Sequence, residues 1–231
     1  MAERYAIYYA PSPESELWRL GSAWLGRDAW RRSAAQRPDF PELSLLDLEA
    51  LTEAPRFYGF HATLRAPFEL APGTKEEALR QSLGALAHRF EPFREPLEVA
   101  SLGRFLALRP KGEGASLRRL HEAALEIFEP FRAPLGAADL ERRRRAGLTE
   151  AQEGYLQAWG YPYVREFFRF HMTLSGFLAS AVRVEPLLAG LSAYFGSVLS
   201  EPVFMEGVAL FHQSDRAAPF HMLHWVPFLG R

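Results

Sequence analysis

The chain has 231 residues, of which 48% are hydrophobic, 13% aromatic and 24% charged. This composition is typical of a folded globular protein and excludes the disordered and fibrous classes. The formal net charge is −1, so the chain as a whole lacks the positive field that collects nucleic acid or anionic membranes. There is no cysteine, which excludes disulfides, thiolate metal sites and cysteine nucleophiles.

The beginning of the sequence favours a cytoplasmic protein. Charged residues stand at positions 3 and 4 without the apolar run of a signal peptide, and no stretch reaches the roughly 18 apolar residues of a membrane span. We therefore expect a cytoplasmic location and no membrane partner. The sequence carries no indication of the oligomeric state.

In chain order, the hydrophobic pattern predicts a mixture of strands and helices. Alternation and β-branched or aromatic composition mark strands, and apolar residues three and four positions apart mark helices. The prolines at 38, 41 and 55 indicate a loop-rich segment. The expected elements are a strand at 5–10, a helix from residue 12 to 25, a strand at 57–66, a helix from 74 to about 88, two strands within 97–108 broken at residue 103, helices at 116–128 and 149–160, a strand at 167–176, a helix at 184–195, and a closing strand pair at 203–211 and 220–226.

Three of these helices have a starting signal. Ser12 offers an N-cap, and Thr74 and Thr149 begin capping boxes that are completed by Glu77 and Gln152. The mixture of elements predicts an α+β fold, with helices packed on the outer faces of antiparallel sheets.

One segment recurs 110 residues along the chain. Phe-Tyr-Gly-Phe-His-Ala-Thr-Leu at 57–64 and Phe-Phe-Arg-Phe-His-Met-Thr-Leu at 167–174 agree at five of eight positions. A half-chain period predicts one bilobal domain over residues 1–231, with two pseudo-twofold-related sheets and one motif on a strand of each lobe. A central cleft would lie between the lobes.

Side-chain alternation along these two strands predicts a shared polar face. The residues on it are His61, Thr63, Arg65, Arg169, His171, Thr173 and Ser175. A histidine with an unperturbed pKa of about 6.5 can be base or acid at neutral pH, while hydroxyl and guanidinium groups can hold phosphate oxygens. The set therefore suits phosphoryl chemistry and requires no metal or other cofactor.

Paired His-x-Thr-Leu motifs on strands resemble those of the 2H phosphoesterase superfamily. Segments at 24–28, 58–68, 131–135, 141–144, 159–164 and 168–174 resemble the DUF1045 family, whose members are often labelled phosphonate metabolism proteins. The likeness spans nearly the whole chain. The superfamily resemblance implies a bilobal α+β fold with both motifs in a central groove, and metal-independent action on cyclic phosphodiesters. Its catalytic motif matches His61, Thr63, His171 and Thr173.

We therefore expect a 2H-type phosphodiesterase that hydrolyses a cyclic phosphodiester of a small sugar or nucleotide, in a phosphonate pathway if the label applies. One histidine is the expected base and the other the acid, and the pseudo-symmetry leaves their order open. The threonines would hold the phosphate. The expected substrate contacts are Arg65, Arg169, Tyr58 and Ser175, although Tyr58 falls on the apolar face of its strand.

Three alternatives remain open at this stage. The groove could bind a phosphorylated metabolite or an RNA end without turnover, it could belong to an RNA-end cyclic phosphodiesterase or ligase, or the chain could serve as a partner-binding protein. Other features could be functional, but each of them also has an ordinary structural explanation. These are the charge run at 141–145, the aromatic segment at 159–163, and His212, His221 and His224, which could form a metal site with the motif histidines.

Overall fold

The protein is described by a computed structural model that covers residues 3–178 and 184–230. Its strands are β1 (Arg4–Tyr9), β2 (Arg27–Asp28), β3 (Ser33–Ala34), β4 (Ala62–Phe68), β5 (Phe93–Glu95), β6 (Leu97–Leu102), β7 (Phe105–Pro110), β8 (Met172–Thr173), β9 (Val203–Met205), β10 (Gly207–Gln213) and β11 (His221–Pro227). Its α-helices are α1 (Glu16–Leu25), α2 (Leu45–Tyr58), α3 (Glu76–Ala87), α4 (Ala115–Phe128), α5 (Ala137–Arg144), α6 (Glu150–Trp159), α7 (Val184–Tyr194) and α8 (Gly196–Leu199), with 3-10 turns at Glu129–Phe131 and Arg165–Phe167.

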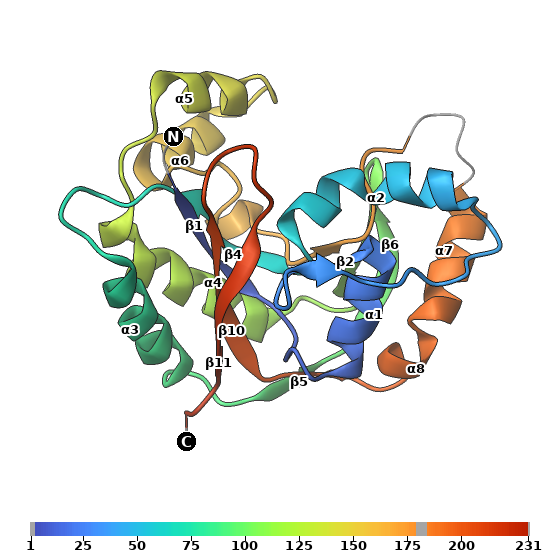
Figure 1. Ribbon diagram of the computed structural model, residues 1–231. Coiled ribbons are helices and arrows are strands. Elements are labelled where there is room, and N and C mark those ends of the chain that lie inside the picture. The colour runs from blue at the N-terminus through green and yellow to red at the C-terminus, as the bar shows by residue number, and fades with distance from the viewer. Residues whose placement is uncertain (1–2, 179–183, 231) are drawn as a thin grey trace.

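Seven of the strands form one sheet in the order β11-β10-β1-β4-β8-β7-β6, and every neighbouring pair is antiparallel. Helices α3 and α4 flank the half of the sheet that contains β10, β1 and β4, whereas α1, α2 and α7 lie on the other side of the molecule (Figure 1). The predicted α+β class with antiparallel strands is confirmed. Within the described residues, no helix combines the length and apolarity needed to cross a bilayer.

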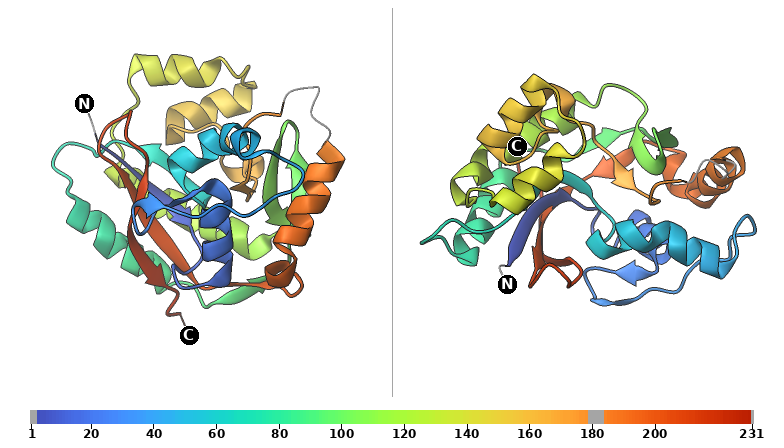
Figure 2. Two further views of the ribbon diagram at one scale, coloured as in Figure 1. Left: turned by 45° about the vertical axis from the view of Figure 1, so that its right-hand side comes forward. Right: turned by 90° about the horizontal axis from the view of Figure 1, so that it is seen from above.

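The two motif strands, β4 and β8, are neighbours in the middle of this sheet, where Ala62 pairs with Met172. Instead of two separate sheets, the structure has two halves joined through this pair. One half consists of β11, β10, β1 and β4, and the other of β8, β7 and β6 (Figure 2). The first of these halves combines β1 and β4 from the beginning of the chain with β10 and β11 from its end. The halves of the sheet are therefore not successive halves of the chain.

Apolar side chains on the helices hold the motif strands in place. Helix α4 buries Leu117, Leu120, Ala124 and Phe128 on one side, at the spacing of helical turns, and packs against β4. Full burial of one such leucine stabilises the fold by roughly 1.5–3 kcal/mol. Across the sheet, the indole of Trp24 in α1 donates a 2.7 Å hydrogen bond to the carbonyl of Leu174, which anchors the segment of the second motif.

Local signals predicted some helix starts correctly and others wrongly. The capping box of Thr149 and Gln152 is present at α6. Helix α1 begins later than predicted, because Ser15 rather than Ser12 caps it. The predicted capping box at Thr74 is wrong, since α3 follows Lys75 and the Thr74 hydroxyl instead donates to the carbonyl of Ala71, closing a turn.

The predicted loop over 38–55 is partly wrong, because α2 occupies residues 45–58. Its proline, Pro55, has no N–H to donate to the carbonyl of Leu51, and the backbone N–H of Gly176 donates to that carbonyl instead, at 2.7 Å. The same helix displaces the start of the first motif strand from Phe57 to Ala62. Gly59 makes the reversal between them with a φ of 86°, in a region that favours glycine.

The second motif segment was predicted as a strand over 167–176, but only Met172 and Thr173 are paired as β8. The Ser175 hydroxyl accepts the backbone N–H of Leu106 at 2.8 Å. A side chain thus takes the bond that a continuing ladder would give to the backbone, so the strand ends there.

Candidate active site

The two His-x-Thr motifs cross at their middle residues. Because Ala62 pairs with Met172 in antiparallel sense, continuing the register sets residue 61 opposite 173 and residue 63 opposite 171. Directly opposite Cβ atoms in such a pair are about 4.5–5.5 Å apart, and diagonal neighbours about 7–8 Å. Each histidine therefore faces the threonine of the other motif, and the two histidines are diagonal neighbours.

Two cavities follow this crossing. A cavity of about 260 Å³ is lined by His61 and Thr173, and one of about 610 Å³ is lined by His171 and Thr63. The four motif side chains are only partly buried, so they are accessible from these cavities. The structure brings together the four residues for which catalysis was predicted.

Aromatic side chains border the two cavities. Phe105 and Phe177 line both of them, and Phe177 is 81% exposed. The ring of Phe105 lies 5.5 Å from that of His171, centroid to centroid. Tyr163 lines the larger cavity and Tyr58 the smaller one.

Backbone carbonyls orient both imidazoles in the same way. His61 donates from Nδ1 to the carbonyl of Gly59 at 2.8 Å, and His171 donates from Nδ1 to the carbonyl of Arg169 at 2.7 Å. Since a carbonyl only accepts, Nδ1 carries the proton and Nε2 of the neutral ring has a free lone pair. The Thr63 hydroxyl lies 3.3 Å from His61 Nε2 and can donate to it.

Burial keeps both histidines neutral at pH 7. It lowers the pKa of His61 to about 4, with the hydrogen bond to Gly59 opposing and the nearby His171 adding to this effect. Burial also lowers the pKa of His171. The buried ring of Tyr8 stacks on His61 at a centroid distance of 3.7 Å. In the free protein both Nε2 atoms are therefore proton acceptors.

Arg65 was predicted to share the polar face of β4, but a β-bulge interrupts the alternation before it. Tyr8 pairs with Thr63 whereas Ile7 pairs with Arg65, so one extra residue of β4 stands between these pairs. Arg65 borders the larger cavity but is only 2% exposed, and its guanidinium forms an ion pair with Glu129. Burial lowers its pKa to about 10, so it remains charged at neutral pH.

The other predicted substrate contacts differ in what they offer. Arg169 is exposed and lines the larger cavity, with Nη1 held by the carbonyls of Glu166 and Phe168. Tyr58 lies at the end of α2 rather than on a strand, where it stacks on Phe220. Ser175 borders the smaller cavity but is 1% exposed, and its hydroxyl is already bonded to backbone groups.

The remaining sequence features lie outside the crossing or at its border. The charge run at 141–145 belongs mostly to α5, and Tyr161 of the aromatic segment lines the larger cavity beneath Arg143. His212 and His221 lie on β10 and β11, with ring centroids 5.0 Å apart. Among residues 3–178 and 184–230, no group of three or more histidine, aspartate or glutamate side chains is placed to hold a metal ion.

Several residues of the site were not predicted from the sequence. Phe105, Arg109 and Phe177 line the larger cavity, and the buried Tyr8 stacks on His61. Phe105 lies within a predicted strand and Arg109 directly after it, but only the pairing of β7 with β8 places them beside the second motif. The one signal available for Arg109 was a charged residue following an apolar strand pattern.

Comparisons with known proteins agree with the resemblance seen in the motifs. The family model described as "Protein of unknown function (DUF1045)" matches residues 63–221. A protein of Laribacter hongkongensis named ribose 1,5-bisphosphate phosphokinase PhnN is 42% identical over 98% of this chain and 53% of its own length. A protein of the same name from Janthinobacterium is 36% identical over 99% of this chain and 51% of its own length. The chain thus spans about half the length of these relatives.

Among solved structures, TT0787 of Thermus thermophilus aligns over the whole of both chains, with 19% identity and a TM-score of 0.46. The family match covers more than half of the chain and includes both threonines and the second histidine of the crossed motifs. This chain therefore belongs to the DUF1045 family.

Proposed function

We propose that this chain is a metal-independent phosphodiesterase, which hydrolyses a cyclic phosphodiester of a small phosphorylated sugar or nucleotide. One observation carries the proposal, namely the crossing of the two His-x-Thr motifs, in which Nδ1 of each histidine is bonded to a backbone carbonyl and each Nε2 can accept a proton. A diagonal separation of about 7–8 Å between the histidines leaves room for one phosphate between them.

In the proposed reaction, Nε2 of one histidine takes a proton from water while the water oxygen bonds to phosphorus. The ester bond from phosphorus to the leaving oxygen breaks, and the second histidine gives its Nε2 proton to that oxygen. The threonine hydroxyls donate to the non-bridging oxygens, where charge must be accommodated. Proton exchange with solvent then restores the starting state.

The surroundings of the two histidines favour His61 as the base. Burial strongly favours its neutral form, which can accept a proton. The acid must be protonated in the complex, and a bound phosphate anion raises the pKa of a neighbouring imidazole. His171 beside the larger cavity fits this second role.

The curated relatives support a phosphorylated ribose as the substrate class. Their name, ribose 1,5-bisphosphate phosphokinase, belongs to proteins about twice as long as this chain. This sequence has no Gly-x-x-x-x-Gly-Lys-Ser/Thr motif of the kind that cradles nucleotide phosphates in many kinases. We assign the phosphokinase activity to the remainder of those relatives, and to this chain a reaction on a related sugar phosphate, in keeping with the phosphonate metabolism label.

The test is phosphorus NMR of a substrate panel in EDTA, with His61→Ala and His171→Ala in parallel. The panel contains 2′,3′-cyclic nucleotides and ribose cyclic phosphates. Turnover that either substitution abolishes is the expected result. Saturable binding without product, retained in both variants, would replace the proposal by a non-catalytic phosphate-binding function.

A second measurement tests the assignment of base and acid. Catechol cyclic phosphate has a more acidic leaving group than a sugar ester, so it needs less help from a general acid. If this compound is a substrate, it should restore part of the activity of His171→Ala and none of that of His61→Ala. The reverse pattern would exchange the two roles.

A further inference from the structure

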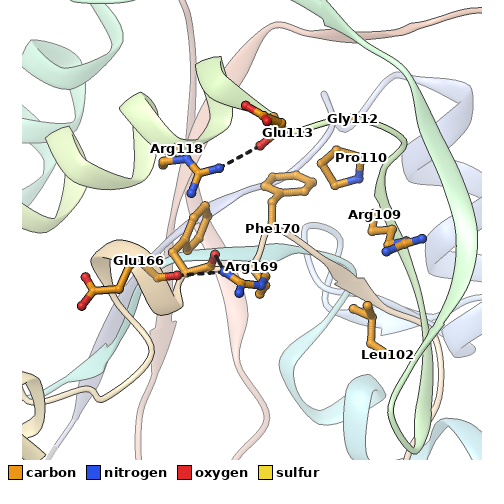
Figure 3. A pocket seen from close by; sticks show the side chains of 11 residues that line it. Leu102, Arg109, Pro110, Gly112, Glu113, Arg118, Glu166, Arg169 and Phe170 are labelled. Atoms are coloured by element: carbon orange, nitrogen blue, oxygen red, sulfur yellow. Dashed lines mark hydrogen bonds between the residues drawn. The ribbon is translucent and has the colours of Figure 1, made fainter. Parts of the chain in front are cut away.

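A third cavity, of about 430 Å³, adjoins the larger active-site cavity and contains three arginines, Arg109, Arg118 and Arg169. We call it the arginine cavity. Arg109 and Arg169 line both cavities, so they stand where the two meet. Figure 3 shows the three arginines on different sides of the arginine cavity, with Phe170 and Pro110 between them.

The sheet register places Arg109 next to the second histidine. Ala107 pairs with Thr173 and Leu108 with Met172, so continuing the register by one residue sets Arg109 opposite His171. Opposite residues of an antiparallel pair have their Cα atoms about 4.5–5.5 Å apart. A ligand whose ester lies at His171 therefore needs to extend only from β8 to the neighbouring strand β7 to meet the guanidinium of Arg109.

The equivalent position beside the first histidine has no charge. Tyr8 pairs with Thr63 and Tyr9 with Ala62, so the same continuation sets Ala10 opposite His61. Ala10 is fully buried. The crossed motifs are thus symmetric in their backbone, but only the His171 side leads to cationic side chains.

The three guanidinium groups retain free donors. Among the described residues, Arg169 uses Nη1 for two carbonyls and Arg118 uses Nη2 for the carbonyl of Glu113, while each guanidinium has five N–H groups. Arg109 pairs with Glu98 at 2.9 Å, but the two side chains are 47% and 35% exposed. Solvent screens such a pair, so it competes weakly with a bound anion.

Two carboxylates also line the arginine cavity, those of Glu113 and Glu166. Glu166 accepts a 2.7 Å hydrogen bond from the hydroxyl of Tyr155. In Figure 3 its carboxylate is directed away from Arg169. The arginines can therefore approach an anion without first releasing Glu166.

We propose that the arginine cavity binds a second phosphate group, which is not cleaved, on the same small molecule whose cyclic phosphodiester reaches the histidines. The inference rests on the proposed function for its placement of the cleaved ester. Planar guanidinium groups bind phosphate oxygens in bidentate fashion, and a phosphomonoester offers three oxygens and nearly two negative charges. The substrate class is therefore a sugar or nucleoside with a cyclic phosphodiester and a separate terminal phosphate.

The test compares cytidine 2′,3′-cyclic phosphate with the same compound bearing a 5′-phosphate. The added phosphate should raise kcat/KM by at least about 10-fold, the value of one to two charge-assisted hydrogen bonds. Arg118→Gln should reduce this ratio toward 1. Arg119→Gln is the matched control, because Arg119 is an exposed neighbour on α4 that does not line the arginine cavity, and it should keep the wild-type ratio.

Equal kcat/KM for the two compounds, or an unchanged ratio in Arg118→Gln, would overturn the second-phosphate site. So would a stronger preference for an oligonucleotide with a 2′,3′-cyclic end than for the 5′-phosphorylated mononucleotide.

If no cyclic ester is hydrolysed, the binding of ribose 5-phosphate still tests the cavity. Binding that Arg118→Gln weakens and His171→Ala retains would support the site although the proposed function has failed. Equal binding by wild type and Arg118→Gln would refute the site as well.

Discussion

The neutral state of His61 predicts how the stability of the protein depends on pH. Its pKa is about 4 in the folded protein, below the unperturbed value of about 6.5 expected for the unfolded chain. Between these values the unfolded chain binds more protons, so stability falls as the pH decreases through this window. The full difference corresponds to about 3 kcal/mol, of which about 2 kcal/mol is lost between pH 8 and pH 5.

Replacing His61 by asparagine removes this titration. The free energy of unfolding of His61→Asn should therefore fall by about 2 kcal/mol less than that of wild type between pH 8 and pH 5. Urea unfolding at the two pH values, followed by circular dichroism, measures the difference. The buried His121 and the partly buried His221, whose pKa values are also lowered to about 4, act equally in both proteins and cancel.

The control is Thr52→Val, which changes a buried side chain that does not titrate. It should lower stability equally at pH 8 and pH 5. If His61→Asn has the same pH dependence as wild type, His61 is not held neutral by its surroundings, and the reasoning that makes it the base fails with it.

Three further substitutions test the supports of the site. Tyr8→Leu removes the ring stacked on His61 and should lower kcat by about 10-fold with little change in KM, whereas Tyr8→Phe should keep most of the activity in the same kinetic assay. Gly59→Ala forces a side chain into a backbone conformation with a φ of 86°, so thermal unfolding should show a loss of about 1–3 kcal/mol. Glu129→Gln leaves Arg65 buried without its ion-pair partner and should cost about 3 kcal/mol in urea unfolding, more than Arg65→Met, which removes the charge itself.

The repeated motif allowed the centre of the site to be predicted, because two copies of His-x-Thr in apolar frames define a face on each strand. Local strand alternation indicates that His61 and Thr63 share a face, and the structure places them 3.3 Å apart, Nε2 to hydroxyl. Alternation fails for Arg65, because a bulge is a property of the pairing between β4 and β1 and leaves no mark in the sequence of β4 alone.

The walls of the site depend on contacts between distant segments, which no local pattern records. Tyr8 stacks on His61 because β1 pairs with β4, and Arg109 lines the same cavity as His171 because β7 pairs with β8. Helix α2 was missed for a different reason. The prolines at 38, 41 and 55 indicated a loop, whereas in the structure Ser44 caps the helix and Pro55 lies within it.

The symmetric backbone of the two motifs carries different side chains at equivalent positions, and the resulting site is asymmetric. Tyr8 opposite Thr63 and Ala107 opposite Thr173 hold matching places beside the two motifs. The tyrosine ring stacks on His61, whereas the fully buried Ala107 offers only a methyl group beside the second motif. The cavity that His171 lines is also the larger one, at about 610 Å³ against 260 Å³. A substrate larger than its reacting phosphate must then extend past His171, which is why the proposed acid, the leaving group and the second phosphate all belong on that side.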